Sequence, residues 1–538
     1  MSERYDVVIV GAGFAGMYLL HELRARDYRC VVLEMGDDVG GTWYWNRYPG
    51  ARCDAESLAY SYSFSPELEQ EWEWTERYAT QPEILAYAKH VSERFELRKD
   101  IRFNQKVAHT HWQDDDHCWR VETEAGLVVE GRYCVMATGC LSVPQLPDIA
   151  GVDDFQGERY QASLWPDGVD FTGKRVGLIG TGSSGIQAVP VIAAQAEQLY
   201  VFQRTPNFSV PAENDPLDPD WVERFKQHYR DHRRFHKLGL SSGFGDLDIE
   251  PKERAPMAET AEGLSHDEVA GILDLYWERG GAFFLSAFAD SLINPATNER
   301  IARYVHNKIK ATVKDPVTAE LLCPKDHPIG TKRICVDTGY YETFNRENVT
   351  LVDVASDPIE RVTASGLKTA SAEYEFDVLA LATGFDAMTG ALLRMDIRGK
   401  DGLKLADKWN AGPRSYLGLS ISGFPNLFTV TGPGSPSVLS NMLVSIEQHV
   451  DWIVACLEYM KTSEASEFEA LEADEDVWVA HVNEVAEATL MPQGGSWYLG
   501  ANVAGKPRVF MPYAAGVGPY REICDEVAGD GYRGFEFR

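Results

Sequence analysis

Two glycine clusters in this chain have the spacing G-x-G-x-x-G, which is typical of dinucleotide binding when it joins a strand to a helix. They consist of Gly11, Gly13 and Gly16, and of Gly180, Gly182 and Gly185. Such glycines permit a tight turn, let the backbone approach a pyrophosphate at the helix N-terminus, and allow helix and strand to pack closely. Two dinucleotide sites on one chain imply a redox relay between two cofactors.

The elements expected around the first cluster are those of a βαβ unit. Residues 5–10 form a β-branched apolar run, residues 14–26 have apolar side chains at helical spacing, and residues 29–33 predict a second strand. Glu34 closes that strand, where a carboxylate accepts hydrogen bonds from a ribose 2′-hydroxyl and repels a 2′-phosphate. The first unit is therefore predicted to bind FAD or NAD, and not NADP.

The second unit repeats this pattern with a different residue at the deciding position. Its strands are expected at residues 175–179 and 199–203, with a helix that begins near Ser183. Arg204 and Thr205 stand where the first unit has Glu34. A guanidinium there can bind a phosphate with two hydrogen bonds, which favours NADP. The two units together predict FAD at the first and NADPH at the second.

Composition limits the class of protein. With 538 residues, 44% of them hydrophobic, the chain can bury a large core and exceeds the usual size of one domain. The net charge of -31 argues against nucleic-acid binding, and no apolar run is long enough for stable membrane insertion. The nine cysteines form no C-x-x-C pair, and the chain starts almost at once with a cofactor-binding strand instead of a signal peptide. These features indicate a cytoplasmic enzyme.

The order of these features along the chain predicts an interleaved α/β fold. Residues 135–139 and 379–384 are short apolar strands that end in Ala-Thr-Gly, as expected where the chain returns to a nucleotide-binding sheet. We therefore expect two Rossmann-like dinucleotide-binding domains, for FAD and NADP, with an inserted helical subdomain. The expected FAD domain comprises residues 1–140 and 386–538, the linker plus NADP domain residues 141–211 and 333–385, and the helical insertion residues 212–332, with helices over 221–237, 267–279 and 297–313.

Two further segments resemble the signatures of a known family. Residues 40–54 read GGTWYWNRYPGARCD and fit [A/G]-G-x-W-x(4)-[F/Y]-P-[G/M]-x(3)-D, while residues 155–166 fit F-x-G-x-x-x-H-x-x-x-W-P at all but one defined position. These are the signatures of type I Baeyer–Villiger flavin monooxygenases. The resemblance covers nearly the whole chain, including GTKR at 330–333, GPGSPS at 432–437 and SWYLGAN at 496–502.

The resemblance implies a reaction and its catalytic residues. In this family NADPH gives a hydride to FAD, reduced flavin adds O₂ as a C4a peroxide, and the peroxide attacks a ketone to form an adduct that rearranges to an ester or lactone. Arg333, within GTKR, is implied as the fixed cation that stabilises the reduced flavin and the peroxide. Asp54 is implied as the carboxylate that pairs with it and lowers the cost of burying its charge.

The resemblance also implies contacts to cofactors and substrate. Gly41 and Trp43 would continue the FAD site, and Lys332 would join Arg204 and Thr205 around the NADP 2′-phosphate. Trp497 would contact the nicotinamide half, with a packed core tryptophan as an equal alternative. The residues implied to line the substrate pocket, with ordinary loop-to-helix packing as a rival interpretation, are Ser437, Val438, Leu439 and Met442. The expected partners are a small-molecule ketone and O₂, with no metal, in a monomer or weak homo-oligomer.

One position departs from the family pattern. Gln161 stands where the family has a histidine, and glutamine forms hydrogen bonds but cannot become cationic. We expect this change to affect NADPH coupling and pH dependence more than the type of reaction.

Other functions stay open at this point. The flavin monooxygenases that oxygenate nitrogen and sulfur keep the histidine but lack Trp-Pro, so Trp165 and Pro166 favour the Baeyer–Villiger branch over that alternative. A non-catalytic flavin- or nucleotide-binding redox sensor is a distant alternative. A flavoprotein disulfide reductase needs a redox cysteine pair, which the cysteine spacing does not offer.

Overall fold

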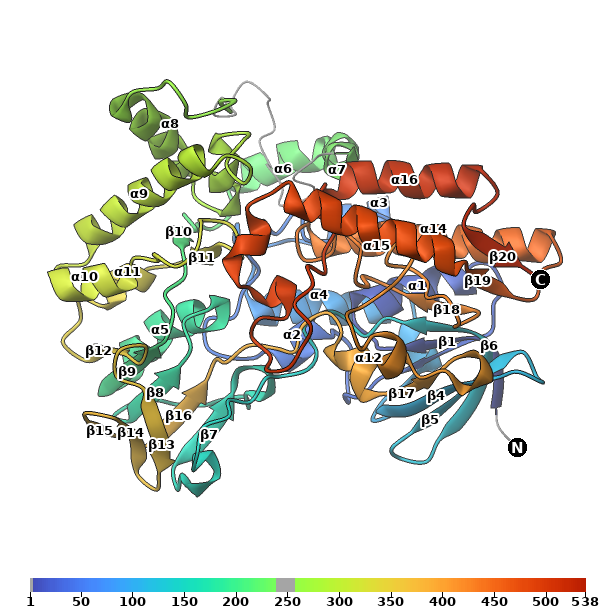
Figure 1. Ribbon diagram of the computed structural model, residues 1–538, viewed down its shortest axis with the longest axis horizontal. Helices are drawn as coiled ribbons and strands as arrows, with labels where there is room; N and C mark the ends of the chain where they lie inside the picture. Colours follow the sequence, from blue (N-terminus) through green and yellow to red (C-terminus); the bar gives the residue numbers. More distant parts are fainter. Residues whose placement is uncertain (1–2, 239–256) are drawn as a thin grey trace.

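The structure is a computed structural model, and it describes residues 3–238 and 257–538. Two sheets with parallel strands at their centres lie at opposite ends of the molecule, the first at the right of Figure 1 and the second at the lower left. We call the parts of the chain around them the first unit and the second unit. Loops run between them, and the long helices of the C-terminal part of the chain lie above the first sheet in this view.

The first sheet has the strand order β17-β4-β5-β6-β1-β2-β3, with β18 also paired to β6. Its centre is a parallel Rossmann-like core, because β1 runs parallel to both β2 and β6. The strands are β1 (Glu3–Val10), β2 (Cys30–Leu33), β3 (Ile101–Arg102), β4 (Val107–Gln113), β5 (Cys118–Thr123), β6 (Val128–Met136), β17 (Asp396–Arg398) and β18 (Leu427–Thr429).

The second sheet has the order β12-β9-β8-β16-β7, and all its strands are parallel. Its two central strands, β8 and β16, are largely buried, as expected from their continuous apolar runs. The strands of this sheet are β7 (Glu158–Gln161), β8 (Arg175–Ile179), β9 (Gln198–Gln203), β12 (Val349–Asp353) and β16 (Val378–Leu381). An antiparallel three-stranded sheet follows β12, formed by β13 (Ile359–Thr363), β14 (Gly366–Thr369) and β15 (Glu373–Glu375).

Helices cover both units and bury their apolar faces on two separate cores. Those packed in the first unit include α1 (Phe14–Arg24), α2 (Thr42–Trp45), α3 (Pro66–Glu71), α4 (Gln81–Arg94), α14 (Met442–Thr462), α15 (Glu472–Glu487) and α16 (Val517–Gly529). Those packed in the second unit include α5 (Ser183–Gln195) and α11 (Tyr340–Thr343). The remaining short elements are α12 (Gly390–Arg394), α13 (Leu405–Lys408), β19 (Phe468–Ala470) and β20 (Phe535–Phe537).

The segment 212–332 is helical, and its described part contains no β-strand. The helix expected over 221–237 is instead two helices, α6 (Pro219–Gln227) and α7 (Tyr229–Leu238), because His228 leaves the helical region at φ -113°. The other helices are α8 (His266–Arg279), α9 (Pro295–Thr312) and α10 (Pro316–Leu322). They begin at side-chain caps, and a capping box of Ser265 and Glu268 starts α8.

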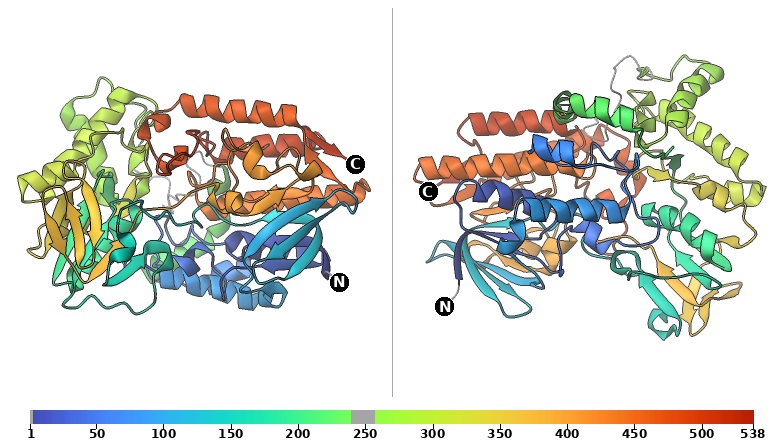
Figure 2. Two further views of the ribbon diagram at one scale, coloured as in Figure 1. Left: turned by 60° about the horizontal axis from the view of Figure 1, so that its bottom comes forward. Right: turned by 180° about the vertical axis from the view of Figure 1, so that it is seen from behind.

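These helices divide between the two units. Phe225 of α6 and Tyr229 of α7 pack into the core of the first unit, whereas Leu273 of α8 and Ile301 of α9 pack into that of the second. Figure 2 shows α8 to α10 on the side of the second unit in both views. The chain enters this segment through β10 (Ser209–Pro211) and leaves it through β11 (Cys335–Asp337), which pair in parallel. Within the described residues, no helix is long and apolar enough to cross a membrane.

Candidate active site

The first glycine cluster has the close backbone contacts of a dinucleotide fingerprint. Gly11 lies at φ +106°, and a Cβ there would stand 2.5 Å from the carbonyl oxygen of Ala137. A Cβ at Gly16 would stand 1.9 Å from the carbonyl oxygen of Gly11. No side chain fits at either position, so β1, α1 and the Ala-Thr-Gly end of β6 meet at backbone distance.

The second cluster repeats this geometry and adds an open position. Gly180 lies at φ +113° with its hypothetical Cβ 2.3 Å from the Ala382 carbonyl oxygen, and that of Gly185 is 2.1 Å from the Gly180 carbonyl oxygen. A Cβ at Gly182 would meet nothing within 4 Å. Gly182 is exposed at the N-terminus of α5, so that helix end faces open space of the kind a pyrophosphate requires.

The start of segment 40–54 contacts the first glycine cluster. Gly41, at φ +53°, packs so closely on Gly13 that a Cβ on it would stand 2.9 Å from the Gly13 Cα. Trp43 is buried and its indole N–H donates to the Tyr60 hydroxyl over 3.1 Å. Gly41 therefore lies at the candidate FAD fingerprint, and Trp43 supports it from the core.

Glu34 lies at the end of β2, as the sequence indicates. Its carboxylate accepts hydrogen bonds from the backbone N–H of Ala12, over 2.7 Å, and of Gly36, over 2.8 Å. Burial raises the pKa of this carboxyl, and the backbone donors partly offset that effect. A hydrogen-bonded carboxylate thus sits directly beside the fingerprint turn.

Two cations meet at the end of β9. Burial lowers the pKa of Lys332, and the nearby positive charge of Arg204 lowers it further against the opposing effect of Asp326. The Asp326 carboxylate is 3.7 Å from the Lys332 ammonium. Thr205 is tied to the second fingerprint, because its carbonyl accepts a 3.0 Å hydrogen bond from the Thr181 hydroxyl. The fold therefore brings the turn of Arg204 and Thr205 to the second fingerprint, and it places Lys332 near enough to Arg204 for their charges to interact.

Arg333 and Asp54, which are 279 residues apart, form a bidentate ion pair. Arg333 donates from Nε to Oδ2 over 2.7 Å and from Nη2 to Oδ1 over 2.8 Å, and the side chains are 23% and 21% exposed. Burial alone would lower the pKa of Arg333, but the Asp54 carboxylate raises it by more, so the guanidinium is cationic at every practical pH. The same pairing outweighs burial at Asp54 and lowers its pKa.

A backbone carbonyl also accepts a hydrogen bond from the guanidinium of Arg333. Arg333 Nη1 donates to the Val438 carbonyl over 2.6 Å. Val438 lies at φ +66°, a conformation that costs a β-branched residue on the order of 1–3 kcal/mol. Tyr498 also lies beside Arg333; burial raises its pKa to about 12, against the lowering effect of the guanidinium. Tyr498 was missed by sequence reasoning, although it follows Trp497 within the matched SWYLGAN segment.

The residues implied to line a substrate pocket separate into two groups. Val438 is buried in an apolar cluster with Tyr498, and the partly buried side chains of Leu439, Met442 and Trp497 pack against it. Ser437 instead is fully buried, and its hydroxyl lies 2.7 Å from that of Ser435. Apolar side chains beside a fixed cation suit an uncharged molecule with one polar oxygen.

Gln161 is buried at the end of β7, 8% exposed. It lies opposite Leu381 of β16, which in turn lies opposite Ile179, the residue before the second fingerprint. Within the described part of the chain its side-chain oxygen has no hydrogen-bond partner. Gln161, the residue that departs from the family pattern, is thus level with the end of β8 in the second sheet.

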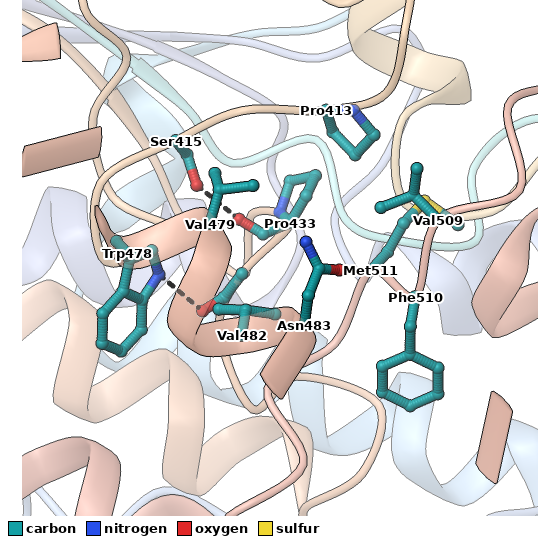
Figure 3. Close-up of a pocket in the computed structure, with 11 residues that line it drawn as sticks. Pro413, Ser415, Pro433, Trp478, Val479, Val482, Asn483, Val509, Phe510 and Met511 are labelled. Atoms are coloured by element: carbon teal, nitrogen blue, oxygen red, sulfur yellow. Dashed lines mark hydrogen bonds between the residues drawn. The ribbon is translucent and has the colours of Figure 1, made fainter. Parts of the chain in front are cut away.

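Two other features complete the description. The pocket in Figure 3 is lined by none of the site residues discussed above, but two of its lining residues, Phe510 and Met511, belong to the same apolar cluster as Val438 and Tyr498. Among the described residues, one group that could hold a metal ion consists of His109, His111 and Asp396. Arg398 already donates to both oxygens of that carboxylate at 3.0 Å, so we assign the group no metal.

Residues 8–240 match the family described as pyridine nucleotide-disulphide oxidoreductase. This range contains both glycine fingerprints. All nine cysteines lie in the described part of the chain and are free, so no disulfide accompanies the match.

Relatives match over the full length. A 2-oxo-Delta(3)-4,5,5-trimethylcyclopentenylacetyl-CoA monooxygenase of Pseudomonas putida is 41% identical, covering 99% of this chain and 98% of its own. A Baeyer-Villiger monooxygenase of Pseudooceanicola batsensis is 39% identical over 98% of this chain and 95% of its own. A phenazine N-monooxygenase of Lysobacter antibioticus is 36% identical over 99% of this chain and 96% of its own.

Solved structures agree with the architecture. An oxidized steroid monooxygenase bound to NADP has a TM-score of 0.93 and 49% identity, over 99% of each chain. A complex of the protein OTEMO with FAD and NADP has a TM-score of 0.95 and 39% identity, over 100% of each chain.

Proposed function

Because this chain belongs to the Baeyer–Villiger monooxygenase family, we propose that it uses NADPH, O₂ and FAD to insert one oxygen atom next to the carbonyl of a ketone, which yields an ester or lactone. The observation that carries this proposal is the bidentate pair of Arg333 and Asp54 beside an apolar cluster. Asp54 follows the first glycine fingerprint in the sequence, and Arg333 follows the second. The pair therefore joins segment 40–54 to the end of the helical segment.

The first unit fits FAD. Gly11, Gly13 and Gly16 would hold the pyrophosphate at the start of α1, and Gly41 would extend the cradle that the glycine contacts define. The Glu34 carboxylate beside that turn suits a ribose hydroxyl. Bound FAD supplies the chemistry with O₂ once NADPH has reduced it.

The second unit fits NADPH. The open position at Gly182 would receive the pyrophosphate, and Arg204 with Lys332 would bind the 2′-phosphate, with Thr205 at the same turn. Trp497, packed against the apolar cluster, would contact the nicotinamide half. The second unit thus offers two cations, whereas the first offers a carboxylate. This difference in charge is the physical reason why the two units would bind different cofactors.

We assign Arg333 the catalytic role and Asp54 the role of fixing it. A permanent cation held by two hydrogen bonds needs no reorganisation when negative charge develops on a reacting oxygen, which is the most effective form of electrostatic stabilisation. Asp54 prevents rotation of the guanidinium, and the Val438 carbonyl limits its tilt. Val438, Leu439 and Met442 exclude water and bind the carbon skeleton of the ketone, and the buried Ser437 supports the turn that carries them.

The test is Arg333→Ala, with Arg333→Lys as the conservative variant. Loss of a fixed donor of this kind costs about 10²–10³-fold in rate, so ester formation from a ketone should fall by at least that factor in Arg333→Ala. Lysine keeps the charge but not the fork, so partial activity is expected. FAD content should be unchanged in both. Arg361→Ala, which removes an exposed pair with Asp154, is the control. Wild-type ester yield in Arg333→Ala would refute the assignment.

A second function is favoured by one specific relative. Because a phenazine N-monooxygenase resembles this chain over its full length, oxygenation of nitrogen or sulfur is the competing proposal. Products from a ketone, a thioether and an aromatic N-heterocycle, each supplied with NADPH, separate the two. Sulfoxide or N-oxide without any ester would replace our proposal by this one. A redox sensor without catalysis would form none of these products.

We further propose that the enzyme acts in the cytoplasm as a monomer or weak homo-oligomer. The nine free cysteines fit a reducing compartment. Sedimentation analysis tests the state of assembly.

A further inference from the structure

We propose that Gln187, on α5, is a positioning residue that locks the second unit to segment 40–54 and thereby sets the pose of NADPH relative to FAD. The inference rests on the proposed function and adds a residue that neither the fingerprints nor the ion pair includes.

The Gln187 carboxamide uses both of its ends on the same segment. Its Oε1 accepts a 2.8 Å hydrogen bond from the Tyr48 hydroxyl, and its Nε2 donates over 3.1 Å to the Arg52 carbonyl. A glutamate or an apolar residue cannot make both contacts. Burial raises the pKa of Tyr48 to about 12, so its hydroxyl stays protonated and remains a donor at working pH. We call these two hydrogen bonds the Gln187 clamp.

At the Gln187 clamp, the backbone of segment 40–54 packs closely against that of α5. A Cβ on Gly50 would stand 2.3 Å from the Gln187 carbonyl oxygen and 3.0 Å from the side chain of Val191, and Gly50 lies at φ +77°. Helix α5 therefore contacts segment 40–54 directly at Gly50. Nearby, Arg47 pairs with Asp167 over 2.8 Å, but the Asp167 side chain is 78% exposed, so this pair adds little.

The position of the clamp connects three parts of the site. Segment 40–54 meets the first fingerprint at Gly41 and ends at Asp54 on Arg333. Gln187 lies about one helical turn from the open N-terminus of α5 at Gly182. Since a helix moves as a rigid rod over such a distance, a shift at Gln187 displaces the phosphate-binding end of α5 by a similar amount. A displacement of about 1 Å can lower a rate on the order of 10²-fold.

Two roles for Gln187 can be distinguished. A glutamine on the helix after the second fingerprint could reach the dinucleotide itself. In this structure each carboxamide end instead makes a hydrogen bond to segment 40–54, and these two contacts are the basis for the positioning role.

The experiment compares Tyr48→Phe, Gln187→Leu and the double variant with Gln195→Leu, the same substitution at the exposed far end of α5. In the purified FAD-loaded enzyme we expect unchanged FAD content, a fall of about tenfold or more in the rate at which NADPH reduces the flavin, and more hydrogen peroxide per NADPH consumed. The double variant should be no slower than Gln187→Leu, because that substitution already removes the Tyr48 hydrogen bond that Tyr48→Phe removes. Gln195→Leu should match the wild type.

A second readout does not depend on turnover. Hydrogen–deuterium exchange should increase in residues 47–53 and in the first turns of α5 in both single variants, and not in Gln195→Leu. Wild-type reduction rates in Tyr48→Phe and Gln187→Leu would overturn the proposal. So would a large rise in the NADPH KM of Gln187→Leu alone, which would mean direct binding of the dinucleotide. Neither readout needs a ketone, so failure of the proposed oxygenation would be seen separately as absence of ester from the wild type.

Discussion

At the scale of single residues, the site depends on charges whose neighbours hold them in one state. Arg333 would lose basicity by burial alone, and Asp54 more than restores it. Asp54 would be protonated more easily by burial alone, and Arg333 reverses that effect. Each partner needs the other, because removing one leaves a partly buried charge without compensation. Lys332 and Arg204 are different, since they carry like charges that repel each other, and at Lys332 the Asp326 carboxylate opposes that repulsion.

This difference predicts coenzyme selectivity. In Lys332→Ala one charge-assisted contact to the 2′-phosphate is lost, worth about 1.5–3 kcal/mol, so the NADPH KM should rise about 10–100-fold. The kinetics with NADH, which lacks that phosphate, should not change. Steady-state assays with both coenzymes check this. Lys325→Ala, at a more exposed lysine paired with Glu320, is the control. An equal loss with both coenzymes would contradict the assignment.

At the scale of elements, the glycines of the second fingerprint have different roles. Gly185 is required by the fold, because a side chain there would collide with the Gly180 carbonyl. Gly182 has φ -85°, which any residue adopts, and open space beyond its Cα. Among the described residues no atom lies close enough to require glycine at Gly182, so we attribute this glycine to the pyrophosphate proposed there.

The two alanine variants should therefore behave differently. Gly182→Ala should keep the melting temperature and the FAD content of the wild type, while its NADPH KM rises about tenfold or more because the methyl group meets the pyrophosphate. Gly185→Ala should lower the melting temperature, since α5 must shift away from β8. Thermal unfolding, FAD content and NADPH kinetics of both variants test this. Normal NADPH kinetics in Gly182→Ala would move the coenzyme away from this helix end.

At the scale of the whole molecule, the helical segment 212–332 is joined to the second unit by a pair of short strands. The pair of β10 and β11 carries the chain into and out of segment 212–332, and its last residue, Asp337, is buried at 6% exposure. Asp337 accepts hydrogen bonds from the Ser209 hydroxyl and, over 3.0 Å, from the Tyr340 N–H. Burial, partly offset by these donors, raises its pKa to about 6.

This carboxyl makes stability depend on pH. Its folded pKa exceeds the ordinary value of 3.8, so its stabilising effect is complete in acid and is lost as the pH rises through about 6. The rise from 3.8 to about 6 corresponds to about 3 kcal/mol at pH 8. Asp337→Asn removes the charge: its oxygen can accept from the Tyr340 N–H, and its NH2 can donate to the Ser209 hydroxyl, which can itself donate to the Cys335 carbonyl 3.2 Å away. The variant should therefore be more stable than the wild type by up to that amount at pH 8, and by almost nothing near pH 4. Denaturant unfolding at both pH values measures this, and a difference independent of pH would contradict it.

The sequence by itself determined the local elements and the chemistry of the cofactors. The βαβ patterns, the fingerprints, Glu34 and Arg204 act over neighbouring residues, where chain geometry and side-chain type are sufficient. The fold class and the family follow from them and from the signature segments, and the full-length relatives confirm both. The sequence did not reveal the break at His228, since two short helices have the same periodicity as one long helix.

Only the tertiary structure decided how distant residues meet. The resemblance implied that Asp54 pairs with Arg333, but only the structure gives this pair its bidentate geometry, turns the Val438 carbonyl toward the guanidinium and sets Tyr48 on Gln187. Such contacts depend on how two separately packed cores are oriented, and on backbone atoms that carry no signal in residue type. For the same physical reason the sequence could name the groups of this site, but not the clamp that holds its two halves together.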